Sequence, residues 1–133
     1  PDIVVGTKEA REVLPREIPM AHAVTQWGNV GGLVAGLALG DVALIGRSMH
    51  DVVAEPYRKG FIPGYDRLKE GVLSEGALAM NIAGSGPSVF ALAADRSVSE
   101  RVAERMKSHF AGLGIGCNIY AGRVSNRGAR IEE

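Results

Sequence analysis

One stretch of the sequence restricts the possible folds more than any other. Residues 21–39 are 19 consecutive positions without a charged side chain, and their apolar residues keep a helical spacing. Glycines recur every four residues, at Gly28, Gly32, Gly36 and Gly40. The pattern predicts a long helix that begins at Met20 and ends at Gly40, with a glycine groove against which another element packs closely.

The length of this stretch calls for a comparison with membrane helices. Its 19 residues are close to the length that spans a bilayer, and small residues four apart are typical of packed membrane helices. Polar side chains are costly within a span, however, and this stretch contains His22, Thr25, Gln26 and Asn29. We therefore interpret it as a core helix and expect no membrane partner.

The residues before the long helix predict the end of a strand and a short helix. Residues 1–6 are mostly apolar and are expected to be the last part of a strand. Thr7 suits the N-cap of a short helix that ends at Pro15. After the long helix, Asp41 suits the N-cap of a helix that continues to Val52.

Beyond that helix the chain is interrupted by proline. Pro56 breaks the helical pattern, which leaves residues 55–60 as a loop, and a further short helix is expected over residues 65–73.

The hydrophobic period then changes from that of a helix to that of a strand. Residues 78–83 and 89–93 predict two strands, joined by a glycine-rich turn over residues 84–88. Residues 97–100 have the form of a capping box, which predicts a helix that continues to Gly112.

The C-terminal residues complete the expected sheet. Apolar residues alternate with polar ones over residues 117–124, which predicts a last strand, and the polar tail of residues 125–133 is expected to be partly extended. The order strand, helices, hairpin, helix, strand predicts an α+β domain: a mostly antiparallel sheet with helices packed on one face. A chain of 133 residues, 46% apolar, fits one domain.

Composition narrows the range of functions. Fifteen Lys and Arg balance fifteen Asp and Glu, so no net positive field can hold a nucleic acid, and Trp27 and Tyr57 are too few for a stacking surface. The single cysteine, Cys117, excludes a disulfide framework and fits a reducing compartment such as the cytoplasm. The three histidines lack the spacing of metal ligands, so we expect no metal site in this chain.

The glycine turn is the first candidate for chemistry. Gly84, Ser85 and Gly86 lie between two apolar strands, where their backbone N–H groups can point at one spot and bind an anion. The alternative is a tight hairpin whose glycines only supply a positive φ.

A pair of arginines is the second candidate. Arg11 follows Thr7 by four residues, which places the guanidinium and the hydroxyl on one helix face, and Arg58 lies between Pro56 and Gly60. A guanidinium is suited to bind a carboxylate through two parallel hydrogen bonds. The alternative is that both arginines form ion pairs with neighbouring glutamates at the surface.

Four segments together resemble one kinase family. They are residues 7–15 (TKEAREVLP), 53–58 (VAEPYR), 62–65 (IPGY) and 82–92 (IAGSGPSVFAL). The chain resembles the family that comprises galactokinase, homoserine kinase, mevalonate kinase and phosphomevalonate kinase, and its glycine turn resembles the third signature of that family. The first two segments are similar to those of the homoserine kinases. The resemblance implies a ferredoxin-like C-terminal domain.

The resemblance also implies roles for the candidate residues. Arg11 and Arg58 would bind the α-carboxylate of L-homoserine, and Thr7, as a catalytic residue, would lie near the hydroxyl that accepts phosphate. The glycine turn would support the phosphate loop and the bound substrate. The implied reaction converts ATP and L-homoserine to ADP and O-phospho-L-homoserine, a step toward threonine.

In this family ATP and Mg²⁺ are bound mainly by an N-terminal domain, through a Gly- and Ser-rich loop. Nothing in the 133 residues matches that loop. We therefore expect residues 1–133 to be the C-terminal domain of a two-domain kinase, inactive alone, whose partners are L-homoserine, ATP and its own N-terminal domain. A homodimer is a further option.

Other functions stay open at this point. The acceptor could be mevalonate or a sugar, although a sugar has no carboxylate for the two arginines. The chain could instead be an amino-acid-binding regulatory domain. It could also be a structural dimerisation domain that uses the glycine-groove helix or a sheet edge.

Overall fold

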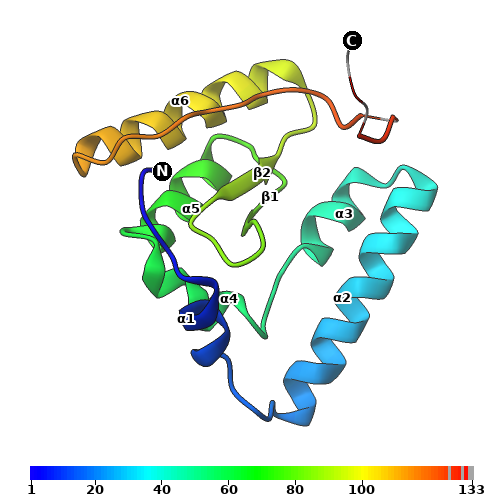
Figure 1. Cartoon of the computed structure of the whole chain (residues 1–133). Helices are drawn as coiled ribbons and strands as arrows, with labels where there is room; N and C mark the ends of the chain where they lie inside the picture. Colours follow the sequence, from blue (N-terminus) through cyan, green and yellow to red (C-terminus); the bar gives the residue numbers. More distant parts are fainter. Residues whose placement is uncertain (126, 130, 132–133) are drawn as a thin grey trace.

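The computed structural model describes residues 1–125, 127–129 and 131. In chain order its elements are α1 (Thr7–Glu12), α2 (Met20–Leu39), α3 (Val42–Ser48), α4 (Glu55–Arg58), the 3₁₀ helix η1 (Lys59–Phe61), α5 (Tyr65–Ser74), β1 (Ala79–Ile82), β2 (Val89–Leu92) and α6 (Arg96–Gly112). Figure 1 shows two parts: the α2–α3 pair on one side, and α5, α6 and the β1–β2 hairpin on the other. The expectation for the tail falls partly outside the described residues.

The hydrophobic core lies where α5, α6 and the hairpin meet. β1 pairs with β2 in an antiparallel ladder, in which Ala79 lies opposite Leu92 and Ile82 opposite Val89. The largest fully buried side chains come from all three elements, and they are Leu68, Val72, Met80 and Phe110. The predicted fold class, α+β with an antiparallel sheet and packed helices, is confirmed.

Two predicted strands are not formed. Residues 1–6 and 117–124 contain no strand, although the backbone N–H of Asp2 donates to the Gly116 carbonyl oxygen at 2.6 Å. A strand needs a partner along its length, and among the described residues β2 pairs only with β1. The alternating pattern is therefore present in the sequence, but the ladder that it needs is not.

Helix boundaries differ from the prediction in the first half of the chain. Gly6, not Thr7, is the N-cap of α1, and α1 ends at Glu12. α3 begins after the predicted cap Asp41, whose carboxylate accepts a hydrogen bond from the Leu44 N–H at 2.9 Å, but it ends at Ser48. Residues 55–60, predicted as a loop, belong to α4 and η1, because Pro56 is compatible with the first turn of a helix.

The cap of α6 lies two residues before the predicted one. Asp95, rather than Ser97, is the N-cap: its carboxylate accepts from the Val98 N–H at 2.9 Å and from the Ser97 hydroxyl at 3.0 Å. Glu100 does not complete a capping box, because its carboxylate pairs with Arg96 at 2.7 Å.

The predicted glycine groove is confirmed at two of its four positions. A Cβ atom at Gly32 would collide with the Ser48 hydroxyl, and one at Gly36 would lie 3.0 Å from the Ile45 backbone nitrogen, so α2 and α3 pack closely there. Gly28 faces open space, and Gly40 ends α2 with a φ of 68°. None of the helices in the described part of the chain is both long and apolar enough to cross a bilayer.

Candidate functional site

Arg58, at the C-terminal end of α4, connects three segments that are far apart in the sequence. Its Nε donates to the Ala10 carbonyl oxygen of α1 at 3.1 Å, and its Nη1 donates to the Gly84 carbonyl oxygen of the glycine turn at 3.0 Å. The side chain is half-buried. The structure therefore brings α1, α4 and the glycine turn together around one guanidinium group.

α4 is held in place by the carboxylate of Asp51. Both of its oxygens accept backbone hydrogen bonds at the start of the helix, from the N–H groups of Val53 at 2.8 Å, Ala54 at 2.9 Å and Glu55 at 3.1 Å. These donors have no partner within a short helix, so the carboxylate stabilises a four-residue helix that would be marginal alone. The position of Arg58 depends on this cap.

Three carboxamide side chains fix the segment that leads into α4. Asn29 donates to the His50 carbonyl oxygen at 2.7 Å, and Gln26 accepts from the Val52 N–H at 3.0 Å. From β1, Asn81 donates to the Met49 carbonyl oxygen at 2.9 Å. Sequence reasoning noticed Gln26 and Asn29 only as polar residues in an apolar helix. That mismatch was the available signal for their role.

A cavity of about 270 Å³ lies against Arg58. Its polar lining includes Gln26 and Asn29 of α2, Asp51, Arg58 and Asn81, and Gly84 lies at its edge. A volume of this order suits a small metabolite. The cavity therefore combines one cation, three carboxamides, the carboxylates of Asp51 and Glu55, and Gly84 of the glycine turn.

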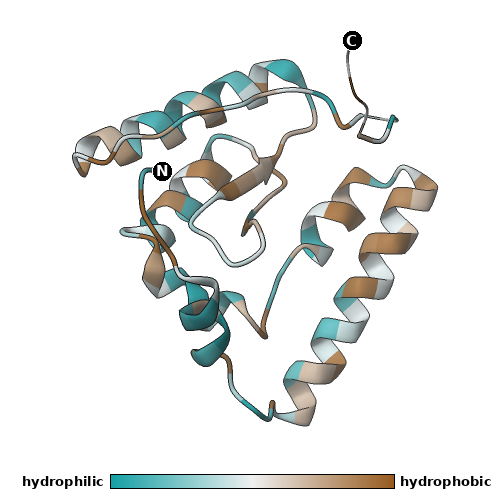
Figure 2. Ribbon diagram, viewed as in Figure 1, coloured by the Kyte–Doolittle hydropathy of each residue, from teal (hydrophilic) through white to brown (hydrophobic). Residues whose placement is uncertain are grey.

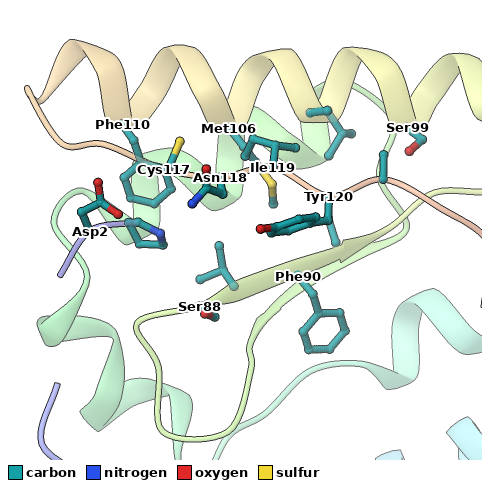
Figure 3. A pocket seen from close by; sticks show the side chains of 16 residues that line it. Asp2, Ser88, Phe90, Ser99, Met106, Phe110, Cys117, Asn118, Ile119 and Tyr120 are labelled. Carbon is teal, nitrogen blue, oxygen red and sulfur yellow. The ribbon is translucent and has the colours of Figure 1, made fainter. Parts of the chain in front are cut away.

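A larger cavity, of about 410 Å³, lies elsewhere (Figure 3). It is a slot between β2, one face of α6 and residues 117–121, with Asp2 at one end. None of the candidate site residues lines it. It marks the place where the two predicted strands lack a ladder partner, so we do not assign the chemistry to it.

Below the smaller cavity, α4 and α5 share an ion pair that is largely shielded from solvent. Lys69 Nζ lies 2.5 Å from the Glu55 carboxylate, and the two side chains are 19% and 11% exposed. Burial, together with the negative charge of Glu55, raises the pKa of the neighbouring Tyr65 hydroxyl. The pair and the tyrosine anchor α4 to α5.

The predicted site residues are placed as follows. Thr7 and Arg11 both lie on α1, one turn apart and exposed, and Arg11 directly follows Ala10, whose carbonyl oxygen Arg58 contacts. Within the described residues, the Arg11 side chain forms no hydrogen bond or ion pair, so its guanidinium is available to a ligand. Of the predicted residues, only Arg58 and Gly84 are joined by a hydrogen bond in the described part of the chain. Arg11 is the neighbour in sequence of Ala10, which Arg58 also contacts.

The glycine turn is compatible with both interpretations of its sequence, a tight hairpin with glycines at positive φ and a turn that binds an anion. Gly84 and Gly86 have φ values of 63° and 83°, which a residue with a side chain rarely adopts. Among the described residues, neither the Gly84 N–H nor the Ser85 N–H has an acceptor, whereas the Gly86 N–H donates to Ala83 at 3.1 Å. The Ser85 hydroxyl donates to the Gly86 carbonyl oxygen at 3.3 Å. Two adjacent N–H groups therefore stay available for an anion.

Comparison with known proteins identifies the family. The family model "GHMP kinases C terminal" matches residues 33–112, more than half of the chain. This chain belongs to the GHMP kinase family. The matched range includes Arg58 and the glycine turn, whereas α1 lies outside it.

Named relatives agree with this assignment and cover nearly the whole chain. The homoserine kinase of Chlorobaculum tepidum is 45% identical over 98% of this chain, and that of Chloroherpeton thalassium is 46% identical over 98%. The crystal structure of homoserine kinase from Cytophaga hutchinsonii superposes on 90% of this chain with a TM-score of 0.88, at 48% identity, and this chain covers 38% of it. The chain spans 41% of the length of each of the two curated relatives. The predicted family resemblance is confirmed.

Proposed function

We propose that residues 1–133 are the C-terminal domain of a two-domain, ATP-dependent kinase that phosphorylates the side-chain hydroxyl of L-homoserine. The observation that supports this most strongly is the contact of Arg58 with both α1 and the glycine turn, since it sets a cation at the junction of the two segments that the family would use for substrate and phosphate. The names of the relatives supply the acceptor.

The donor count of Arg58 is compatible with a bound carboxylate. A guanidinium has five N–H groups, and two of them are engaged by the backbone of Ala10 and Gly84. Nη1 keeps one further N–H and Nη2 keeps both of its own, so both nitrogens of that end can still donate to a carboxylate. Arg11 would supply a second cation from α1.

The proposed chemistry rests on position and charge rather than on covalent catalysis. The hydroxyl oxygen of homoserine attacks the γ-phosphorus of ATP and loses its proton to the surrounding medium, and the bond from that phosphorus to the β,γ-bridging oxygen breaks, which releases ADP. Arg11 and Arg58 would fix the carboxylate end of the acceptor, and Thr7 would lie near its hydroxyl. The two available N–H groups of the glycine turn would face the phosphate side.

ATP and Mg²⁺ belong mainly to the N-terminal domain in this proposal. The N–H groups of Gly84 and Ser85 fit a phosphate oxygen, which is a contribution this chain can make. No group of three or more His, Cys, Asp and Glu side chains within the described ranges is arranged to hold a metal ion. The resemblance to the family is what assigns the magnesium ligands to the other domain in this proposal. The proposal places the reaction in the cytoplasm.

The test is steady-state kinetics of the complete natural chain. We expect Arg11→Ala and Arg58→Ala each to raise the KM for homoserine about 10- to 100-fold, because each removes a charge-assisted contact worth about 1.5–3 kcal/mol. The KM for ATP should change much less. Arg67→Ala is the matched control, because Arg67 is exposed on α5 and does not line the cavity. Equal effects on both substrates would refute the carboxylate assignment. Binding of homoserine without any phosphoryl transfer would favour a regulatory domain instead.

A further inference from the structure

The charges that line the site cavity do not match the ligand proposed for it. Apart from His50, the charged side chains in its lining are the carboxylates of Asp51 and Glu55 and the guanidinium of Arg58. Two negative charges beside one positive charge repel a carboxylate ligand. Other groups of the fold must therefore offset both carboxylates if Arg58 is to bind a third one.

The carboxylate of Asp51 is offset by the backbone at the start of α4. Its two oxygens accept hydrogen bonds from the N–H groups of three consecutive residues, 53–55, at 2.8 to 3.1 Å. Hydrogen bonds to an ionised acceptor are about twice as strong as those between neutral groups. Asp51 is thus fully engaged with the chain, and the uncompensated charge is that of Glu55.

Glu55 is close enough in the helix to compete for Arg58. The two residues are three apart in α4, a spacing at which an acidic and a basic side chain form an ion pair. The Glu55 side chain is only 11% exposed, so water screens its charge little. Its Oε2 atom and the neighbouring Tyr65 hydroxyl are both buried without a hydrogen-bond partner among the described residues. Because Arg58 keeps unused N–H groups, it could satisfy that oxygen.

Lys69 of α5 binds the Glu55 carboxylate from the side away from the cavity. Its Nζ lies 2.5 Å from Glu55 Oε1, and its side chain is 19% exposed. The same Nζ lies 5.8 Å from the ring centroid of the buried Tyr65, within the range of a cation–π attraction. Lys69 itself does not line the cavity. It can therefore neutralise Glu55 without touching a ligand.

Among the described residues, Lys69 is the only ion-pair partner of Glu55. Lys59, four residues after Glu55, donates to both oxygens of Asp66, at 2.9 and 2.8 Å. The hydrophilic helix α1 lies beside α4 in Figure 2, but its charged side chains are exposed to water, which screens them. The charge balance of the cavity therefore depends on one shielded lysine.

We propose that Lys69 is a positioning residue that, by binding Glu55, keeps the guanidinium of Arg58 open to the carboxylate of the substrate. This inference rests on the proposed function, because it requires a carboxylate ligand at Arg58. Loss of the lysine charge should let Glu55 turn to Arg58 and form an ion pair within α4, which the ligand must then displace.

The test is calorimetry of the complete natural chain with two ligands, L-homoserine and 3-aminopropan-1-ol, which has no carboxylate. We expect Lys69→Met to bind homoserine at least about tenfold more weakly than the wild type, because the ligand must break the new ion pair. Its affinity for 3-aminopropan-1-ol should change less than about threefold. Equal weakening for both ligands would indicate a general loss of structure and would overturn the proposal.

The matched control is Lys107→Met. It removes the same charge from an exposed position on α6 that does not line the cavity, so it should bind both ligands as the wild type does.

A double variant separates the charge of Lys69 from its role as an anchor. Lys69→Met/Glu55→Gln lacks the ion pair between α4 and α5, but it also lacks the anion that competes for Arg58. We expect it to bind homoserine within about threefold of the wild type. A double variant as weak as Lys69→Met would show that the lysine only anchors α4, and would overturn the proposal.

A second single variant is needed because Lys69→Met leaves a shielded carboxylate unpaired and is less stable. Lys69→Gln keeps an N–H donor for Glu55 but not the positive charge, and it should weaken homoserine binding about three- to tenfold. Unchanged binding in Lys69→Gln, beside a wild type that binds homoserine, would overturn this inference and leave the proposed function standing. A wild type that does not bind homoserine would overturn both.

Discussion

The three glycines that line one side of α2 offer a graded test of how the α2–α3 pair is packed. Each can be replaced by alanine, and the helix backbone is the same at all three positions. Gly28 has open space where a Cβ would be placed, Gly32 faces the Ser48 hydroxyl, and Gly36 faces the backbone of α3. Only the neighbour changes, so the series isolates the effect of the neighbour on stability.

The magnitudes follow from what each neighbour can do. Alanine gains about 1 kcal/mol over glycine within a helix. At Gly28 nothing opposes that gain. At Gly32 the Ser48 hydroxyl must rotate away, and since the Ser48 Cβ lies at 3.4 Å, we expect a net change near zero. At Gly36 the Ile45 nitrogen at 3.0 Å and the Asp41 carbonyl oxygen at 3.3 Å belong to the backbone and cannot rotate, so overpacking of about 2–3 kcal/mol outweighs the gain.

The assay is equilibrium unfolding by urea. We expect Gly28→Ala to raise the free energy of unfolding by about 1 kcal/mol and Gly36→Ala to lower it by about 1–2 kcal/mol. Gly32→Ala should lie between them. If Gly36→Ala were as stable as Gly28→Ala, the close approach of α2 to the α3 backbone would be wrong.

Two further predictions concern the ion pair beneath the site and the cap of α6. Lys69→Met should lower the free energy of unfolding by about 3–5 kcal/mol, because it leaves the shielded Glu55 carboxylate unpaired. The double variant Lys69→Met/Glu55→Leu should recover much of that loss. A double variant no more stable than the single one would argue against the pair. At Asp95, hydrogen bonds from the Val98 N–H and the Ser97 hydroxyl hold the pKa of the folded carboxyl below its ordinary 3.8. Its contribution to stability is therefore full above pH 3.8 and is lost as the pH falls through the lower pKa of the folded state. Thermal unfolding curves recorded between pH 6 and pH 3 should therefore show a smaller loss of stability for Asp95→Asn than for the wild type. An equal loss in both proteins would show that the carboxylate has no such role.

Local signals in the sequence were sufficient for much of the fold. The uncharged stretch followed by Gly40 predicted α2 and its end. The strand-like patterns on either side of the glycine turn predicted both strands of the hairpin. Caps were harder to place when two candidates lay within a few residues. Both Asp95 and Ser97 can accept a backbone hydrogen bond, and only the helix geometry decides between them.

The strands predicted at the two ends of the chain show the limit of such patterns. The alternation near Cys117 describes which faces a strand would present, but a strand also requires a neighbour along its length. The neighbouring strand comes from another part of the chain, which the local sequence does not reveal. Among the described residues, the slot of about 410 Å³ beside β2 marks where such a ladder is not formed.

The contacts around Arg58 were expected from the sequence only in part, and the functional roles of the site residues stay predictions. Arg58 and the glycine turn were selected from the sequence, and the structure joins them directly. Their support was missed, because the bonds of Asn29 and Asn81 to residues 49 and 50 span more than 20 positions and leave no periodic trace. Asp51 was likewise taken as part of a longer helix rather than as the cap of α4.

The most direct test of the central claim compares two ligands that differ only in the carboxylate. The affinities of L-homoserine and 3-aminopropan-1-ol, which lacks that group, are measured by calorimetry for the wild type, Arg11→Ala and Arg58→Ala. If the two guanidinium groups bind the carboxylate, the wild type should prefer homoserine by at least about 10- to 100-fold, and each variant should lose most of that preference. A preference that persists unchanged in both variants would show that the carboxylate is bound elsewhere.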